Sequence, residues 1–115
     1  MEKPHKTAAE LFAAQALASQ LKAELTKNIL PYWMGRVPDS DGGMYGRISG
    51  EDIVDPSAPV GNIMVARILW TFASAYRILK DGGDPVQAKR YLDMALMARN
   101  LIIKRFYDPE FGGSY

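Results

Sequence analysis

The stretch from Gly61 to about Lys80 carries apolar residues on nearly every side of a helix, and this feature constrains the fold more than any other. Its apolar positions follow one another almost without polar gaps: Ile63, Met64, Val65, Ala66, Ile68, Leu69, Trp70, Phe72 and Ala73. A helix of this kind is buried on most of its faces. The sequence therefore predicts a buried helix that other helices cover.

A helix is also predicted ahead of this stretch. Thr7 and Glu10 have the spacing of a capping box, which predicts a helix start. Steps of three or four residues then place one apolar stripe along the helix: Ala14, Leu17, Leu21, Leu25 and Ile29. We expect this stripe to be buried. Because Pro31 has no amide hydrogen, we expect the helix to kink or stop between Ile29 and Trp33.

A third helix follows the turn at residues 81–84. Pro85 opens it, at a position where the missing amide hydrogen costs nothing. The pattern is amphipathic. Its expected inner face consists of Tyr91, Leu92, Ala95, Leu96, Ile102, Ile103 and Phe106.

Residues 35–59 differ in character, since they are rich in Pro, Gly, Asp and Ser. They predict a structured loop, with a short strand over residues 44–48 in a small β-hairpin. The segment Asp41-Gly42-Gly43-Met44-Tyr45 recurs about seventy positions later as Phe111-Gly112-Gly113-Ser114-Tyr115. Two helices lie between the copies, which favours a repeat of helical hairpins with equivalent loops. The alternative is that Gly-Gly before an aromatic residue is a common turn.

Composition excludes several classes of protein. The 115 residues are 48% hydrophobic and 23% charged, which is typical of a globular chain with a core. The 14 Lys and Arg balance 13 Asp and Glu without a basic block, so we expect no nucleic-acid partner. There is no cysteine, no signal-peptide pattern and no apolar run that could cross a membrane. We therefore expect a cytoplasmic protein with no membrane partner.

Arg67 is the only charged residue between Gly61 and Tyr76. A buried guanidinium needs partners, so Arg67 either forms a structural salt bridge or faces a cavity and binds an anionic oxygen. Trp70 lies on the same side of the helix, where it forms either part of the core or the wall of a sugar site. Tyr45 faces either a pocket or solvent. The single histidine, His5, lies in a polar end and cannot form a histidine pair.

Four segments together resemble one enzyme family. They are Asn28-Ile29-Leu30-Pro31-Tyr32-Trp33, Gly42-Gly43-Met44-Tyr45-Gly46-Arg47-Ile48, the segment from Ala66-Arg67-Ile68-Leu69-Trp70-Thr71-Phe72 to Ala75-Tyr76-Arg77, and Asp108-Pro109-Glu110-Phe111-Gly112-Gly113-Ser114-Tyr115. In order and spacing they resemble the opening of the N-acylglucosamine and cellobiose 2-epimerases. The Arg-Ile-Leu-Trp segment is the most specific part.

The resemblance implies an all-α fold, in which residues 1–115 are the N-terminal portion of one catalytic (α/α)6 barrel, a toroid of helical hairpins. In that family one histidine removes the C2 proton of an opened sugar, a cis-enediolate forms, and a second histidine returns the proton to the other face, without a cofactor. The family's arginine falls on Arg67, and both histidines belong to later segments. The implied sugar contacts are Trp70, Tyr45 and Tyr115.

The implied substrate is a small sugar, a disaccharide such as cellobiose or an aminosugar, and we expect the 115 residues alone to be inactive. Val65 and Val60 stand where relatives often carry Asn and Lys, so polar support near Arg67 differs. Two alternatives stay open. One is a non-catalytic helical module that self-associates through exposed surfaces, and the other is a different enzyme on the same toroid, an aldose-ketose isomerase or a glycoside hydrolase.

Overall fold

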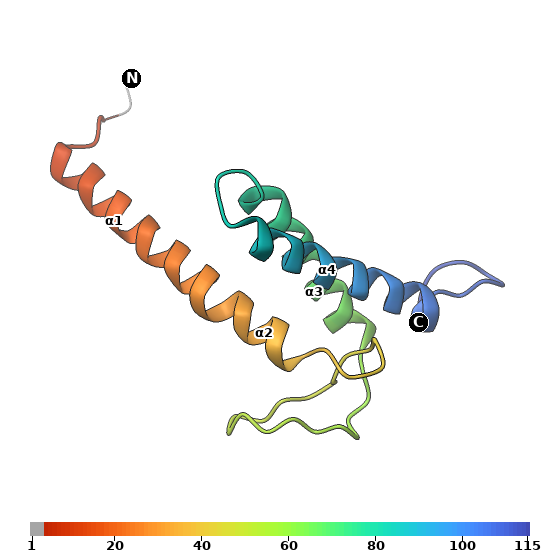
Figure 1. Ribbon diagram of the computed structural model, residues 1–115. Helices are drawn as coiled ribbons and strands as arrows, with labels where there is room; N and C mark the ends of the chain where they lie inside the picture. The colour runs from red at the N-terminus through yellow and green to blue at the C-terminus, as the bar shows by residue number, and fades with distance from the viewer. Residues whose placement is uncertain (1–3) are drawn as a thin grey trace. The chain divides into compact units, whose positions relative to one another are not determined.

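The computed structural model describes residues 4–115 and consists of helices joined by turns (Figure 1). The chain divides into two compact units, which meet at Gly35 and Arg36. No β-strand occurs within residues 4–115, where three isolated antiparallel bridges pair Pro38 with Met44, Ile48 with Val54, and Tyr107 with Ser114. The all-α prediction is confirmed. The predicted strand over residues 44–48 is wrong, because a single bridge closes each turn and no ladder extends from it.

The first unit holds one continuous helical rod (Figure 1). It consists of α1 (Ala8–Glu24), the π-helical turn η1 (Leu25–Ile29) and α2 (Leu30–Arg36), whose last residue already belongs to the second unit. The predicted capping box is present: the Thr7 amide donates to Glu10 Oε2 over 2.8 Å, and the Glu10 amide donates to Thr7 Oγ1 over 3.1 Å. The helix start is therefore confirmed.

Pro31 does not end the rod. Its missing amide hydrogen falls directly after η1, where the Leu30 amide donates to the Leu25 carbonyl, five residues back. A π-helical turn of this kind absorbs a break in the regular α-helical ladder, so the chain continues helically to Arg36. We expected a kink or a stop near Pro31. The structure has a π-helical turn there, and the prediction that the helix stops is wrong.

The apolar stripe of α1 is not buried. Leu17 and Leu21 are 55% and 61% exposed, and no residue of α1 is buried. A helix buries a stripe only against another element, and within residues 4–35 no second helix lies alongside α1. The prediction that this stripe is buried is therefore wrong for the first unit.

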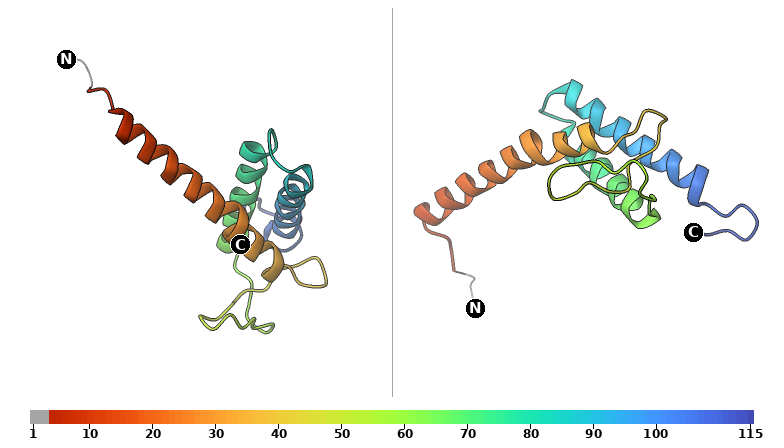
Figure 2. Two further views of the ribbon diagram at one scale, coloured as in Figure 1. Left: turned by 60° about the vertical axis from the view of Figure 1, so that its left-hand side comes forward. Right: turned by 90° about the horizontal axis from the view of Figure 1, so that it is seen from below.

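The second unit is a pair of packed helices with long turns at one end. Helix α3 (Asn62–Leu79) lies beside α4 (Pro85–Leu101) in every view, and the π-helical turn η2 (Ile102–Phe106) extends α4 (Figures 1 and 2). Phe72 and Tyr91 meet across the pair, with ring centroids 6.3 Å apart. The buried side chains of this unit are Val37, Met44, Val65, Ile68, Phe72, Ala75, Ala88, Tyr91, Met94, Ala95, Ala98 and Leu101.

Only one face of α3 is buried, so the prediction of burial on most sides is wrong. Val65, Ile68 and Phe72 face α4, whereas Ile63 and Trp70 are each 73% exposed on the opposite side. A single neighbouring helix covers about one third of a helix surface. An apolar pattern shows that a helix tends to be covered, but it does not say which chain segment covers it.

The buried face of α4 also differs from the prediction. Tyr91 and Ala95 are buried as expected, but Leu96 and Ile103 are 45% and 51% exposed. Other residues take their place in the interface: the small Ala88 and Ala98 and the longer, flexible Met94 are buried. Alanines allow two helices to approach closely, so the contact face is narrower than a count of large apolar residues predicts.

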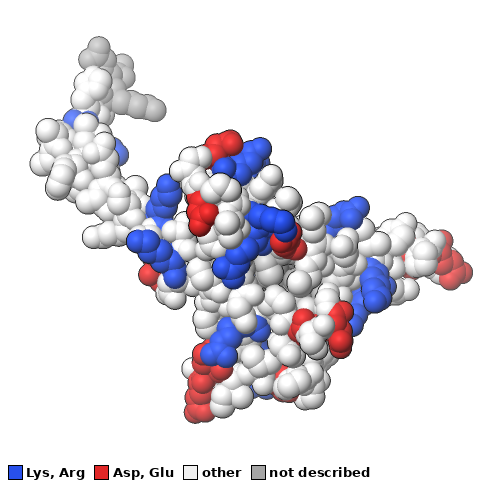
Figure 3. Space-filling model, in the orientation of Figure 1, with Lys and Arg blue, Asp and Glu red and all other residues white. Residues whose placement is uncertain are grey.

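No helix of the described residues is long and apolar enough to cross a membrane. On the face drawn in Figure 3, basic and acidic side chains are interspersed and form no patch of one sign. This distribution agrees with the balanced count of 14 basic and 13 acidic residues.

Candidate active site

The first turn of the second unit is built around Asp39. Its Oδ1 accepts hydrogen bonds from the amides of Asp41 and Gly43, both over 2.8 Å. The Asp39 amide donates to the Gly43 carbonyl over 3.0 Å, and the Tyr45 amide donates to the Val37 carbonyl over 2.8 Å. Short Asp side chains stabilise such turns by pairing with nearby amides. Tyr45 is therefore held at a fixed exit from this turn, where it is half-buried.

The C-terminal loop repeats this design around Asp108. Its Oδ1 accepts from the Glu110 amide over 2.9 Å, and its own amide donates to the Gly113 carbonyl over 3.0 Å. The Tyr115 amide donates to the Phe106 carbonyl over 2.7 Å, as Tyr45 does to Val37. The two Gly-Gly-aromatic segments thus close in the same way, as the repeat predicts. The second loop is one residue longer.

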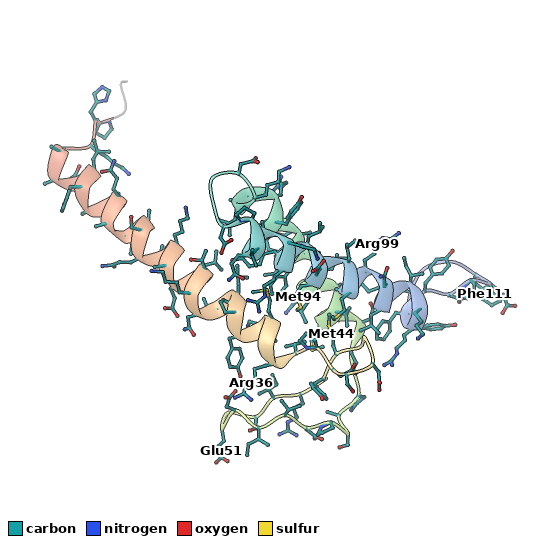
Figure 4. All side chains as sticks on the ribbon, in the orientation of Figure 1. Arg36, Met44, Glu51, Met94, Arg99 and Phe111 are labelled. Atoms are coloured by element: carbon teal, nitrogen blue, oxygen red, sulfur yellow. The ribbon has the colours of Figure 1, made fainter. Side chains whose placement is uncertain are left out.

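A third turn of this type went unnoticed in the sequence. Ser49 Oγ accepts from the amides of Glu51 and Ile53, both over 3.2 Å, and the Ser49 amide donates to the Ile53 carbonyl over 2.9 Å. The Asp55 amide closes the turn on the Arg47 carbonyl over 3.0 Å. Glu51 lies at its tip (Figure 4). The sequence has no Gly-Gly pair at this turn. The feature that could have predicted it is Ser49, a small hydroxyl residue ten positions after Asp39.

The two neighbouring turns need the same backbone conformation three residues after their central side chain. Gly42 adopts φ +78 in the first turn and Asp52 adopts φ +66 in the second. Positive φ suits glycine, and Asp tolerates it better than most residues. The guanidinium of Arg36 forms an ion pair with the Asp52 carboxylate across the base of this loop.

Arg67 and Trp70 lie on the exposed face of α3. Both are exposed, and they line an open hollow together with Ile63, Ala66 and Thr71. A second hollow continues along the helix past the same tryptophan to Arg77. Within residues 4–115, Arg67 makes no ion pair and no side-chain hydrogen bond. The expectation of a buried Arg67 is wrong, because the face of α3 opposite α4 is uncovered.

Asn62 joins the beginning of α3 to the C-terminal loop. Its Nδ2 donates to Ser114 Oγ over 3.0 Å and to the main-chain oxygen of Tyr115 over 2.8 Å. The Tyr115 side chain is 74% exposed. Sequence reasoning missed Asn62, because a polar residue at a helix start is ordinary and its partners lie about fifty positions away.

The structure thus brings three of the four predicted site residues to α3. Arg67 and Trp70 share one hollow, and Tyr115 is attached to the first turn of the helix through Asn62. No hydrogen bond or ring contact of the described residues joins the Tyr45 side chain to the other three. Residues 4–115 contain no cluster of three or more His, Asp or Glu side chains that could hold a metal ion.

Two groups near the turns and the core have shifted pKa values. The hydroxyl and amide of Ser57 donate to the Asp55 carboxylate and lower its pKa below the ordinary value of 3.8. Burial against α3 raises the pKa of the Tyr91 phenol above 10.0. Neither group lies in the Arg67 hollow, so the first acts on loop stability and the second on the core.

Known proteins with similar sequences include cellobiose 2-epimerases. The enzyme of Bacteroides fragilis is 45% identical over 102 residues, which are 88% of this chain and 24% of that protein. The enzyme of Ruminococcus albus is 37% identical over 99 residues, 86% of this chain and 24% of its own length. This chain is homologous to cellobiose 2-epimerases over most of its length. No family model matches it.

The fold agrees with a solved cellobiose 2-epimerase. The structure from Spirochaeta thermophila superimposes with a TM-score of 0.77 at 34% identity, over 96% of this chain and 25% of that one. Helices and turns of this chain therefore match part of an α/α-barrel epimerase. The chain spans about a quarter of the length of the cellobiose 2-epimerases that it matches.

Proposed function

We propose that this chain forms part of an α/α-barrel sugar 2-epimerase that interconverts the C2 epimers of a reducing sugar, with cellobiose or a similar disaccharide as substrate. The observation that carries the proposal is the 45% identity to a cellobiose 2-epimerase over 88% of the chain. The exposed guanidinium of Arg67 beside Trp70 supports it, because this hollow offers a donor and an apolar wall together.

Arg67 is the catalytic residue that this chain contributes. Removal of the C2 proton from the open sugar places negative charge on the oxygens at C1 and C2 as the cis-enediolate forms. A guanidinium presents forked, planar donors that suit two neighbouring oxygens. Donors fixed in advance at the place where charge develops lower the barrier more than they stabilise the substrate. Arg67 belongs to a helix, which fixes the position of its main chain beside the hollow.

The aromatic residues have the role of binding the sugar. Trp70 lines the Arg67 hollow and offers an apolar face for a pyranose ring. Tyr45 and Tyr115 each end a turn of the same type, so their main chains are held by matching hydrogen bonds. We propose that these three side chains contact the sugar, and that Tyr45 and Tyr115 select between a disaccharide and an aminosugar.

The proton-transfer pair has to come from outside these 115 residues. The only histidine is His5, which is exposed ahead of α1. One histidine cannot serve both faces of C2. We therefore expect the purified 115-residue chain to show no epimerase turnover, and measurable turnover would refute the assignment of roles. We also propose, from the composition of the sequence, that the protein is cytoplasmic.

A hybrid protein tests the activity. In this hybrid epimerase, residues 4–115 replace the matching segment of the Bacteroides fragilis cellobiose 2-epimerase. Incubated with cellobiose, it is expected to form the C2 epimer, glucosyl-mannose, which chromatography separates from the substrate. Formation of a keto-disaccharide as the main product would favour the isomerase alternative. A folded hybrid with no activity would favour the non-catalytic helical module.

Two variants of the hybrid test Arg67. Arg67→Lys keeps the positive charge but loses the forked geometry, so we expect a large loss of kcat. Arg90→Ala is the matched control, because Arg90 is an exposed arginine on α4 whose guanidinium donates to the Gln87 side chain. Equal activity of the Arg67→Lys and Arg90→Ala hybrids would refute the catalytic role.

A further inference from the structure

Asn62 uses both hydrogens of its side-chain amide to hold the C-terminal loop. One bond runs to Ser114 Oγ over 3.0 Å and the other to the Tyr115 main-chain oxygen over 2.8 Å. An amide nitrogen carries two donors, so both are used here. Within residues 4–115, these two side-chain bonds tie α3 to the loop after η2, and they span 52 and 53 positions of sequence.

The main chain of Tyr115 is thereby held at both of its polar groups. Its amide donates to the Phe106 carbonyl over 2.7 Å, and its oxygen accepts from Asn62. The side chain itself is 74% exposed, so its place is set through the main chain. Asn62 and Arg67 belong to one helix, five residues apart, and a helix fixes the spacing between its residues.

We propose that Asn62 is a positioning residue, which fixes the loop 107–115 on the first turn of α3 and so sets Tyr115 relative to Arg67. This inference rests on the proposed function, because the positioned groups are the proposed sugar-binding and enediolate-binding residues. Asn62 does not touch the reacting atoms. It determines how the sugar is held, and Arg67 determines how fast the held sugar reacts.

Asn62→Asp separates this role from a role in folding. A carboxylate at the start of α3 interacts favourably with the helix dipole, so the helix itself should not lose stability. The same change removes both donors and leaves a group that only accepts. Ser114→Ala is the partial counterpart, because it removes one acceptor and leaves the bond to the Tyr115 oxygen.

The first test needs only the 115-residue chain. Amide exchange with solvent is measured by NMR at Tyr115, with the Tyr107 amide, which donates to the Ile102 carbonyl over 2.9 Å, as internal control. In Asn62→Asp we expect exchange at Tyr115 to be about fivefold faster, since a lost hydrogen bond costs about 1 kcal/mol and each 1.4 kcal/mol is tenfold. Ser114→Ala should give a smaller increase. Unchanged exchange at Tyr115 in Asn62→Asp would overturn the inference.

The second test uses the hybrid epimerase. We expect Asn62→Asp to raise KM for cellobiose about five- to tenfold while kcat changes less than about twofold, because sugar binding is disturbed and the transition-state donor is not. A fall in kcat at unchanged KM would overturn the positioning role. If the hybrid with Asn62 intact is inactive, the proposed function fails, and the exchange measurement alone then decides whether Asn62 fixes the loop.

Discussion

Gly46 lies where no side chain fits, and its replacement gives the sharpest stability prediction. A Cβ added at Gly46 would lie 2.7 Å from the Pro59 carbonyl carbon, closer still to the Pro59 oxygen, and 3.0 Å from the Ala58 oxygen. All three atoms belong to the backbone, so no flexible side chain can move aside. The loop must shift as a whole to accept Gly46→Ala.

The cost follows from the size of that shift. Overpacking of a tight contact costs about 1–3 kcal/mol and more where the backbone has to move. A loss of about 3 kcal/mol in the free energy of unfolding lowers Tm by more than about 10 °C in a domain of this size. Thermal unfolding followed by circular dichroism measures this change. We expect a clear drop for Gly46→Ala.

Gly50→Ala is the matched control in the next turn. No atom lies within 4 Å of a Cβ built at Gly50, and its φ is not positive. At such a position alanine reduces the entropy of the unfolded chain and stabilises by about 0.4–1 kcal/mol. If Gly46→Ala unfolds at the same temperature as Gly50→Ala, the close passage of residues 58–59 past Gly46 is refuted.

Two further predictions concern the core and the turns. Phe72 is 1% exposed between α3 and α4, so Phe72→Ala should reduce the free energy of unfolding by about 3–5 kcal/mol in urea titrations, and a loss below about 1 kcal/mol would contradict the packing described. The pKa of Asp55 is lowered first by the Ser57 hydroxyl, so its stabilising effect is present above pH 3.8 and is lost as pH falls through the depressed folded-state pKa. Ser57→Ala should move that pKa upward in an NMR titration, and an unchanged value would contradict this cause.

The local signals in the sequence predicted the elements well. Thr7 and Glu10 marked the start of α1, and Gly61 and Pro85 marked the starts of α3 and α4 within one residue. These signals succeed because caps and proline act on neighbouring backbone groups, which the sequence contains. Pro31 was the exception, since a widened turn absorbed its missing donor and the helix went on.

Burial was predicted less well, for a physical reason. The stripe of α1 and the Trp70 face of α3 both carry large apolar side chains, yet both remain exposed. Hydrophobicity favours burial, but burial also requires a covering element. Long-range polar contacts, such as the one between Asn62 and Tyr115, could not be predicted for a similar reason. The residues next to Asn62 in the sequence carry no signal that its partner is Tyr115.

The candidate site was predicted in its parts. The shared hollow of Arg67 and Trp70 follows from their three-residue spacing on one helix, which the sequence shows directly. The two tyrosines came from the family resemblance, and their role in the site stays a prediction. The hydrogen bonds of the two Gly-Gly-aromatic segments that hold them match. The second turn around Ser49 lacked that marker and was found only in the structure.

Exchange of the C2 hydrogen with solvent shows whether Arg67 stabilises the enediolate. The hybrid epimerase is incubated with cellobiose in deuterated water, and deuterium at C2 of the reducing glucose is followed by NMR. We expect the Arg67→Ala hybrid to exchange at least about a hundredfold more slowly than the unaltered hybrid, the usual loss when a donor to a developing oxyanion is removed. The Arg90→Ala hybrid should exchange at the unaltered rate. Exchange by Arg67→Ala at the rate of the unaltered hybrid would contradict the assignment of Arg67 to the enediolate.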